Sequence, residues 1–265
     1  MSAKRPISVL LVAVMLFSTS IMVVLVQGQK SVGFVKIPEE DILPAKSLRN
    51  ITASDSGWVF GYDQVGYIKK MAVEDIPTIT SFQKGVLLNR SALQGIWARE
   101  SGYAVGYDGN GNLVKLPISA ILDDDWRAFT NEEIGVGSGH VFTIKTGDFP
   151  QGVILNFIKV SIDNIPLASR SLNIVYGADS GYVIGFETRW TGNDLRKIPI
   201  SVVPEVPMHQ LSTVIAADSG YVMGLDSQGR LIRVSLSELE MGYASSLANR
   251  IIDADSGFVV CRVVA

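Results

Sequence analysis

Few side chains of this 265-residue protein have the types and spacing that catalysis requires. The chain holds two histidines, His140 and His209, and one cysteine, Cys261. Neither histidine has a second ligand at a spacing typical of a transition-metal site. Gly137-Ser138-Gly139 lacks the Gly-x-Ser-x-Gly spacing of a nucleophile turn. We therefore expect that the protein is not an enzyme and that it has no catalytic, cofactor-binding or metal-binding residues.

One segment resembles the start of a calcium loop. It runs Asp108-Gly109-Asn110-Gly111-Asn112, but Ser119 occupies the twelfth position, where such loops carry a bidentate Glu. The same segment has the composition of a tight turn between two strands. We therefore interpret it as a hairpin turn.

Carboxylates recur directly before a Ser-Gly pair. They are Asp55, Glu100, Asp179, Asp218 and Asp255. They are either equivalent binding sites, as in a carbohydrate-binding lectin, or structural groups that hydrogen-bond backbone amides of the turn. The structural interpretation is favoured, because residues that repeat with a structure generally serve that structure.

The segment 122–133 (LDDDWRAFTNEE) departs most from its neighbours. It places three carboxylates beside a tryptophan and an arginine, and Trp and Arg are favoured anchors of protein interfaces. The candidate partner-binding residues are Asp123, Asp124, Asp125, Trp126 and Arg127. A plain solvated loop is the alternative interpretation.

Composition narrows the class of protein. The net charge is −3, 18% of residues are charged and 47% are hydrophobic. These values disfavour disorder, and the scattered Lys and Arg form no basic stripe for nucleic acid. A single cysteine forms no disulfide within the chain, which suits a bacterial envelope protein or a viral protein.

The N-terminus carries a membrane signal. Lys4 and Arg5 precede an apolar run over 7–26, whose twenty residues span about 30 Å as a helix. We expect residues 1–30 to be one uncleaved transmembrane anchor with a cytoplasmic N-terminus, and the rest to be periplasmic or extracellular. The alternative is a cleaved signal peptide, with small-residue sites at 18–20 or 26–28.

Residues 31–265 contain an internal repeat. A Ser-Gly-aromatic motif recurs six times, with its glycines at positions 57, 102, 139, 181, 220 and 257. A basic-apolar pair follows in five units, for example Lys70-Met71 and Arg233-Val234. A period of about 40 residues is typical of solenoids and propellers.

Each unit has the composition of three strands separated by turns. In the clearest unit they are 213–217, 221–225 and 230–236, rich in β-branched and apolar residues. Propeller blades usually contain four strands. A fourth is expected in the variable stretch, such as 206–210 or 241–247.

The first and last units are incomplete in complementary ways. Residues 34–38 carry only the second half of the motif, and residues 251–265 only the first half. Pairing the two halves completes a sixth unit and removes two exposed sheet edges. We therefore predict an all-β, six-bladed β-propeller over 31–265, closed by its N- and C-terminal half-repeats. A β-prism, or another ring of three-stranded units, is the alternative.

The segment 214–234 (VIAADSGYVMGLDSQGRLIRV) resembles the strand-turn-strand core of quinoprotein-like and related β-propellers. The resemblance covers about 32–265 and implies the fold alone. The Trp that ends a strand in that family is missing here, so a quinone cofactor is not implied.

We expect a membrane-tethered, exported scaffold or accessory subunit that docks partner proteins of an envelope complex. Its partners would be the membrane, through the N-terminal helix, and other proteins. A carbohydrate-binding propeller with pockets between blades is the alternative, and a hydrolase or lyase with acids at the axial mouth is the third hypothesis. Nucleic acid is not expected.

Overall fold

The computed structural model describes residues 33–79, 93, 95–129, 134–149, 152–189, 192–247 and 249–263. This part of the chain is all-β, with twenty strands and eight three-residue 3-10 helices. No helix within it is long and apolar enough to cross a bilayer. The predicted anchor, residues 1–30, lies outside the described residues.

The strands form six antiparallel units, each with an inner, a middle and an outer strand. Unit 1 contains β2 (Arg49–Asp55), β3 (Trp58–Tyr62) and β4 (Ile68–Ala72); unit 2 contains β5 (Ala98–Glu100), β6 (Tyr103–Tyr107) and β7 (Leu113–Pro117); unit 3 contains β9 (Ile134–Gly137), β10 (His140–Phe149) and β11 (Gly152–Ser161). Unit 4 contains β12 (Ile174–Asp179), β13 (Tyr182–Arg189) and β14 (Gly192–Pro199); unit 5 contains β15 (Thr213–Asp218), β16 (Tyr221–Leu225) and β17 (Leu231–Ser235); unit 6 contains β19 (Asn249–Asp255), β20 (Phe258–Val263) and β1 (Phe34–Pro38).

A 3-10 helix follows the outer strand of every unit. These helices are η1 (Glu39–Asp41), η2 (Val73–Asp75), η3 (Ile118–Ala120), η5 (Ile162–Asn164), η6 (Ile200–Val202) and η8 (Leu236–Glu238). Two more, η4 (Trp126–Ala128) and η7 (Met208–Gln210), lie in the connections between units.

The Ser-Gly pairs form the turns between inner and middle strands. All six have positive φ at both residues, as at Ser219 (56°) and Gly220 (78°). Two consecutive positive φ values define the type I′ hairpin, whose twist matches that of the flanking strands. The repeated motif is therefore a turn signal, and the three strands predicted for unit 5 are present within one or two residues.

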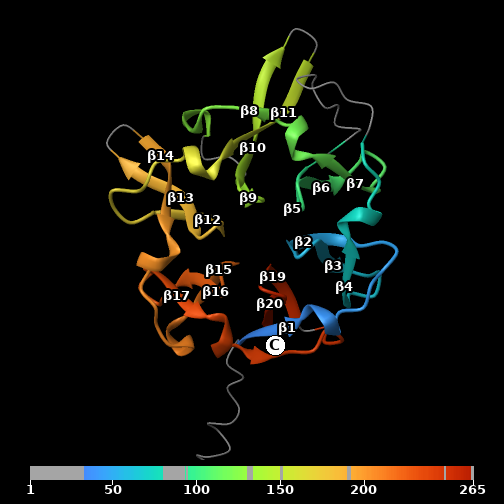
Figure 1. The fold of residues 1–265 in the computed structure, drawn as a ribbon, viewed down its shortest axis with the longest axis vertical. Coiled ribbons are helices and arrows are strands. Elements are labelled where there is room, and N and C mark those ends of the chain that lie inside the picture. The colour runs from blue at the N-terminus through green and yellow to red at the C-terminus, as the bar shows by residue number, and fades with distance from the viewer. Residues whose placement is uncertain are drawn as a thin grey trace, which may run out of the picture.

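The six units are arranged in a ring with the inner strands at its centre (Figure 1). Each inner strand contacts the inner strands of both neighbouring units. The contacting pairs are β2 with β5, β5 with β9, β9 with β12, β12 with β15, β15 with β19, and β19 with β2. The inner strands therefore contact one another all the way round.

The predicted pairing of the two half-repeats is present. β1 lies antiparallel to β20, with Phe34 opposite Arg262 and Pro38 opposite Phe258. The outer strand of unit 6 thus comes from the start of the described chain, while its inner and middle strands come from the end.

At the outer edge of each unit, a short parallel contact takes the place of the expected fourth strand. The segment after each outer strand pairs in parallel with the outer strand of the next unit. Two of these segments are short strands, β8 (Leu122–Asp123) on β11 and β18 (Glu240–Met241) on β1. The others are single bridges, for example Glu205 with Arg233. The expected fourth strands at 206–210 and 241–247 are therefore wrong in extent, because the contact ends at or near the first residue of each.

The hydrophobic core is divided among the joints between units. Six clusters of buried side chains each combine residues of two adjacent units. In the joint between units 1 and 2, for example, Val59 and Met71 pack with Ala98 and Val105. Burial of a large apolar side chain contributes about 1.5–3 kcal/mol, so these joints contribute strongly to stability.

Candidate functional site

The repeated carboxylates connect adjacent units. Each accepts a hydrogen bond from the backbone N–H of the turn glycine in the preceding unit. The donor and acceptor pairs are Gly257 to Asp55 (3.0 Å), Gly57 to Glu100 (3.2 Å), Gly139 to Asp179 (2.6 Å), Gly181 to Asp218 (2.8 Å) and Gly220 to Asp255 (2.7 Å). The structural interpretation of these acids is therefore confirmed, although the amide belongs to the neighbouring turn.

The repeated basic residues also connect adjacent units. In every unit except unit 3, the basic residue places its cation over the motif aromatic of its own unit and donates to a carbonyl at the 3-10 helix of the preceding unit. In unit 3 the ammonium group of Lys159 instead pairs with Asp123. The carbonyl contacts are Lys36 to Leu236 (2.8 Å), Lys70 to Glu39 (2.7 Å), Lys115 to Val73 (2.6 Å), Lys197 to Ile162 (2.7 Å) and Arg233 to Ile200 (2.7 Å). The rings beneath the cations are Phe258, Trp58, Tyr103, Tyr182 and Tyr221.

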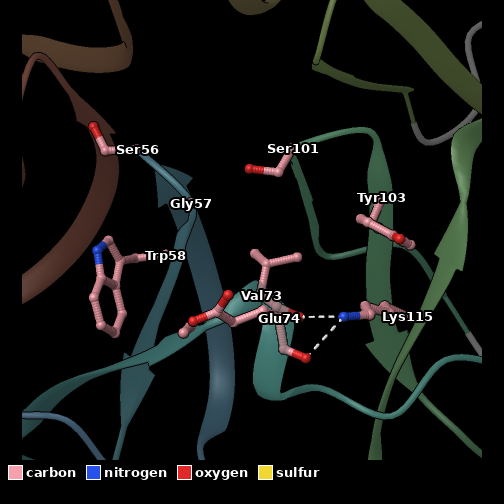
Figure 2. A pocket seen from close by; sticks show the side chains of 9 residues that line it. Ser56, Gly57, Trp58, Val73, Glu74, Ser101, Tyr103 and Lys115 are labelled. Atoms are coloured by element: carbon pink, nitrogen blue, oxygen red, sulfur yellow. Dashed lines mark hydrogen bonds between the residues drawn. The ribbon is translucent and has the colours of Figure 1, made fainter.

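A pocket of about 420 Å³ lies between units 1 and 2. Figure 2 shows Trp58 on one side, Tyr103 and Lys115 on the other, and Glu74 between them. The hydroxyls of Ser56 and Ser101 also line it. Its base is fixed because the Lys115 ammonium donates to the carbonyls of Val73 and Glu74, at 2.6 and 3.1 Å. Aromatic faces, hydroxyls and a carboxylate are the groups that a sugar ring contacts.

A second cavity, of about 390 Å³, lies on the ring axis and is lined by the inner strands of all six units. Its acidic lining residues are Asp55, Glu100, Asp179, Asp218, Asp253 and Asp255. Arg99 is the basic residue among the lining side chains. Burial raises the pKa of Asp253 to about 7 and lowers the pKa of Arg99 to about 10. Sequence reasoning missed both Arg99 and Asp253.

No family model, curated protein or solved structure matches this chain.

The candidate partner-binding loop is held in one conformation by polar contacts. Asp125 accepts from the backbone N–H of Arg127 at 2.9 Å and pairs with its guanidinium at 3.0 Å. Trp126 is half-buried, and the guanidinium groups of Arg127 and Arg196 each lie 4.5 Å from its ring. Asp123 forms an ion pair with Lys159 of unit 3. The structure thus brings the predicted loop residues together, and the charged side chains of Asp123, Asp125 and Arg127 are exposed.

The other residues considered for a metal or catalytic site are His140, Asp108 and His209. His140 packs 6.0 Å from the ring of Phe142, with Nδ1 2.8 Å from the carbonyl of Ser138. Asp108 accepts from the backbone N–H of Asn110 and Asn112, as expected of a hairpin turn. His209 is exposed in η7. Within the described ranges, no cluster of three or more His, Cys, Asp or Glu side chains is placed to hold a metal ion.

Arg99 and Asp253 can be identified by comparing the residues at equivalent positions of the six inner strands. Small or apolar side chains occupy the equivalent positions of the other inner strands. One residue before the acid these are Ser54, Val136, Ala178, Ala217 and Ala254, and two residues before it they are Ala53, Ala98, Gly135, Gly177 and Ala216. Neither position belongs to the Ser-Gly motif or to its turn.

Proposed function

We propose that this protein is a six-bladed β-propeller, closed by the β1–β20 ladder, that serves as a membrane-tethered, non-catalytic scaffold for partner proteins. The observation that supports the proposal is that the repeated polar groups form hydrogen bonds between units. The carboxylates and cations of the repeat hold neighbouring units together. Function is therefore assigned to the places where a unit departs from the repeat.

Unit 3 departs most from the repeat. Gly137 replaces the acid before its Ser-Gly turn, and His140 replaces the larger aromatic ring. Strands β10 and β11 are ten residues long, and their hairpin extends outward past the ring (Figure 1). The loop containing Asp125 and Arg127 lies along the same unit, since β8 pairs with β11. Together these features make unit 3 the proposed docking edge.

The exposed charges of the loop suit a protein interface. The side chains of Arg127 and Asp125 are 69% and 55% exposed, and their contacts with each other limit the rotamers they adopt. A preorganised surface loses less conformational entropy on binding than a mobile one. The apolar run over 7–26 provides the tether, with the propeller on the far side of the membrane from the N-terminus.

Recovery of partners from native membranes in mild detergent tests the scaffold. We expect one set of proteins to copurify with the wild type and to be lost on Arg127→Glu. The matched control is Arg170→Glu, a charge reversal at an exposed arginine of the neighbouring unit, which should retain the set. Removal of residues 1–30 should release the protein from the membrane fraction. Equal recovery with both charge reversals would contradict the proposed docking edge.

The inter-unit pocket favours a second candidate function, carbohydrate binding. The lectin hypothesis was based on the repeated acids, but these form hydrogen bonds between units. The candidate sugar-binding residues are therefore Trp58, Tyr103 and Glu74. Aromatic stacking on a sugar face depends on the indole of Trp58. On a glycan array, Trp58→Ala should abolish binding. Tyr182→Ala, which removes the equivalent ring beneath Lys197 in unit 4, should preserve it.

A further inference from the structure

The axial cavity contains two charged side chains at positions where the other units have small or apolar ones. Arg99 comes from the inner strand of unit 2 and Asp253 from that of unit 6. Burial of charge is costly, and the repeat shows that neither charge is needed to build a unit. Perturbed ionisable groups inside a cavity make it a candidate binding site.

The guanidinium of Arg99 is held but not satisfied. Its Nη2 donates to the carbonyl of Ile96 at 3.0 Å, and its Cζ lies 5.6 Å from the Phe142 ring centroid. Nε is buried without a hydrogen-bond partner in the described part of the chain. A guanidinium has five N–H donors, so this one retains capacity for a bidentate acceptor.

Unit 3 makes room for this guanidinium. A Cβ at Gly135 would lie 1.7 Å from Nη2 of Arg99, and a Cβ at Gly137 would lie 3.0 Å from its Cβ. The glycines of unit 3 and the arginine of unit 2 therefore fit one another. The guanidinium therefore packs directly against the inner strand of unit 3.

Asp253 supplies a carboxyl group with a high proton affinity. Its oxygens accept from the backbone N–H of Ala217 at 2.8 Å and of Ala254 at 2.9 Å. Burial, together with the negative charges of Asp255 and Asp218, raises its pKa to about 7 against the effect of these hydrogen bonds. A nearby cation would stabilise the ionised form and release the proton.

The charges of the cavity select the class of ligand. Six carboxyl groups line it, so a simple anion is repelled, whereas a simple cation leaves the guanidinium of Arg99 without an acceptor. We propose that the axial cavity binds a small zwitterion, with its carboxylate on Arg99 and its ammonium group facing Asp253 and the neighbouring acids. A cavity of about 390 Å³ has room for an amino acid.

Calorimetry on the full-length protein in mild detergent tests this proposal. The probes are glycine, 4-aminobutyrate and 6-aminohexanoate, with butyrate and butylamine as singly charged controls. We expect at least one amino acid to bind about tenfold or more tightly than either control. No binding of the three amino acids up to about 10 mM, or equal binding of butyrate, would overturn the proposal.

Two variants assign the site to its residues. Arg99→Gln should weaken the best probe by about tenfold or more, whereas the charge-matched control Arg170→Gln should leave it unchanged. Titration at pH 7 in buffers of different ionisation enthalpy should show proton release on binding to the wild type and none with Asp253→Asn. Binding without proton release would remove Asp253 from the site. These results do not depend on the docking edge of unit 3.

Discussion

The carboxylate of Asp55 accepts a hydrogen bond from the backbone N–H of Gly257, which is 202 residues away along the chain, at 3.0 Å. This contact joins unit 1 to unit 6, the unit assembled from both ends of the described chain. It matches the contact that joins Gly181 to Asp218 between units that are consecutive in sequence. The joint between units 6 and 1 therefore contains the same hydrogen bond as the joint between units 4 and 5.

Loss of one connecting carboxylate should weaken its joint. Asp179→Ala leaves the N–H of Gly139 without its acceptor at 2.6 Å. We expect a loss of about 1–2 kcal/mol in the free energy of unfolding, measured by urea denaturation. Asp41→Ala, at an exposed aspartate of η1, is the control and should change stability by less than about 0.5 kcal/mol. Equal stability of the two variants would contradict the claim that the Asp179 hydrogen bond stabilises the joint between units 3 and 4.

The glycine in the middle strand should be intolerant of a side chain. A Cβ at Gly224 would lie 1.8 Å from the carbonyl oxygen of Thr213, which is backbone of the paired strand. Gly224→Ala should cost about 3 kcal/mol or more. Cys261 occupies the same position of unit 6 with its side chain accommodated, so Cys261→Ala should cost only about 1 kcal/mol. Thermal melting of the two variants distinguishes them.

The thiol of Cys261 should be unreactive in the folded protein. It is fully buried, and burial raises its pKa to about 12, which suppresses the nucleophilic thiolate. Labelling with a chromogenic disulfide should therefore proceed only in denaturant. Rapid labelling of the native protein at pH 8 would show that the joint between units 6 and 1 is open.

Glu39 should make stability depend on pH. Burial, followed by the charge of Asp55, raises its pKa from 4.5 to about 7. The folded protein therefore holds this proton more tightly than the unfolded chain, and stability falls as pH rises from about 4.5 to 7. The pKa of Asp253 is raised from 3.8 to about 7, so this group acts in the same direction between about pH 3.8 and 7.

Glu39→Gln isolates the contribution of Glu39. At pH 8 the variant should be more stable than the wild type by about 1 kcal/mol, a figure reduced for screening because Glu39 is only half-buried. At pH 4.5 the two should be alike. Urea denaturation at both pH values measures the difference, and an identical pH dependence of both proteins would disprove the role of Glu39.

Local chemistry made the strands and turns predictable. Ser219-Gly220 predicted a tight turn because few residue pairs adopt two consecutive positive φ values at low cost. The complementary halves at 34–38 and 251–265 predicted the pairing of β1 with β20, since an unpaired strand edge is unfavourable.

Contacts between units were harder to predict, because they depend on the angle between sheets rather than on sequence spacing. Asp179 was expected to bond a turn amide, but its partner, Gly139, lies in the preceding unit. Arg99 stands out in the sequence only when equivalent repeat positions are compared, and its contact with Gly135 arises only once the units form a ring. The parallel edge at Glu205 escaped detection because one residue carries the contact.

The pairing of Lys36 with Val260 is the most direct test of the proposed propeller. Hydrogen bonds from Val263 to Gly33 and from Glu39 to Gly257 make Lys36–Val260 a non-hydrogen-bonded pair, whose α-carbons approach closely. A deuterated sample with protonated α-positions should give a strong Hα–Hα nuclear Overhauser effect between these residues. Its absence, in a spectrum that shows the corresponding effects between β19 and β20, would contradict closure of the ring.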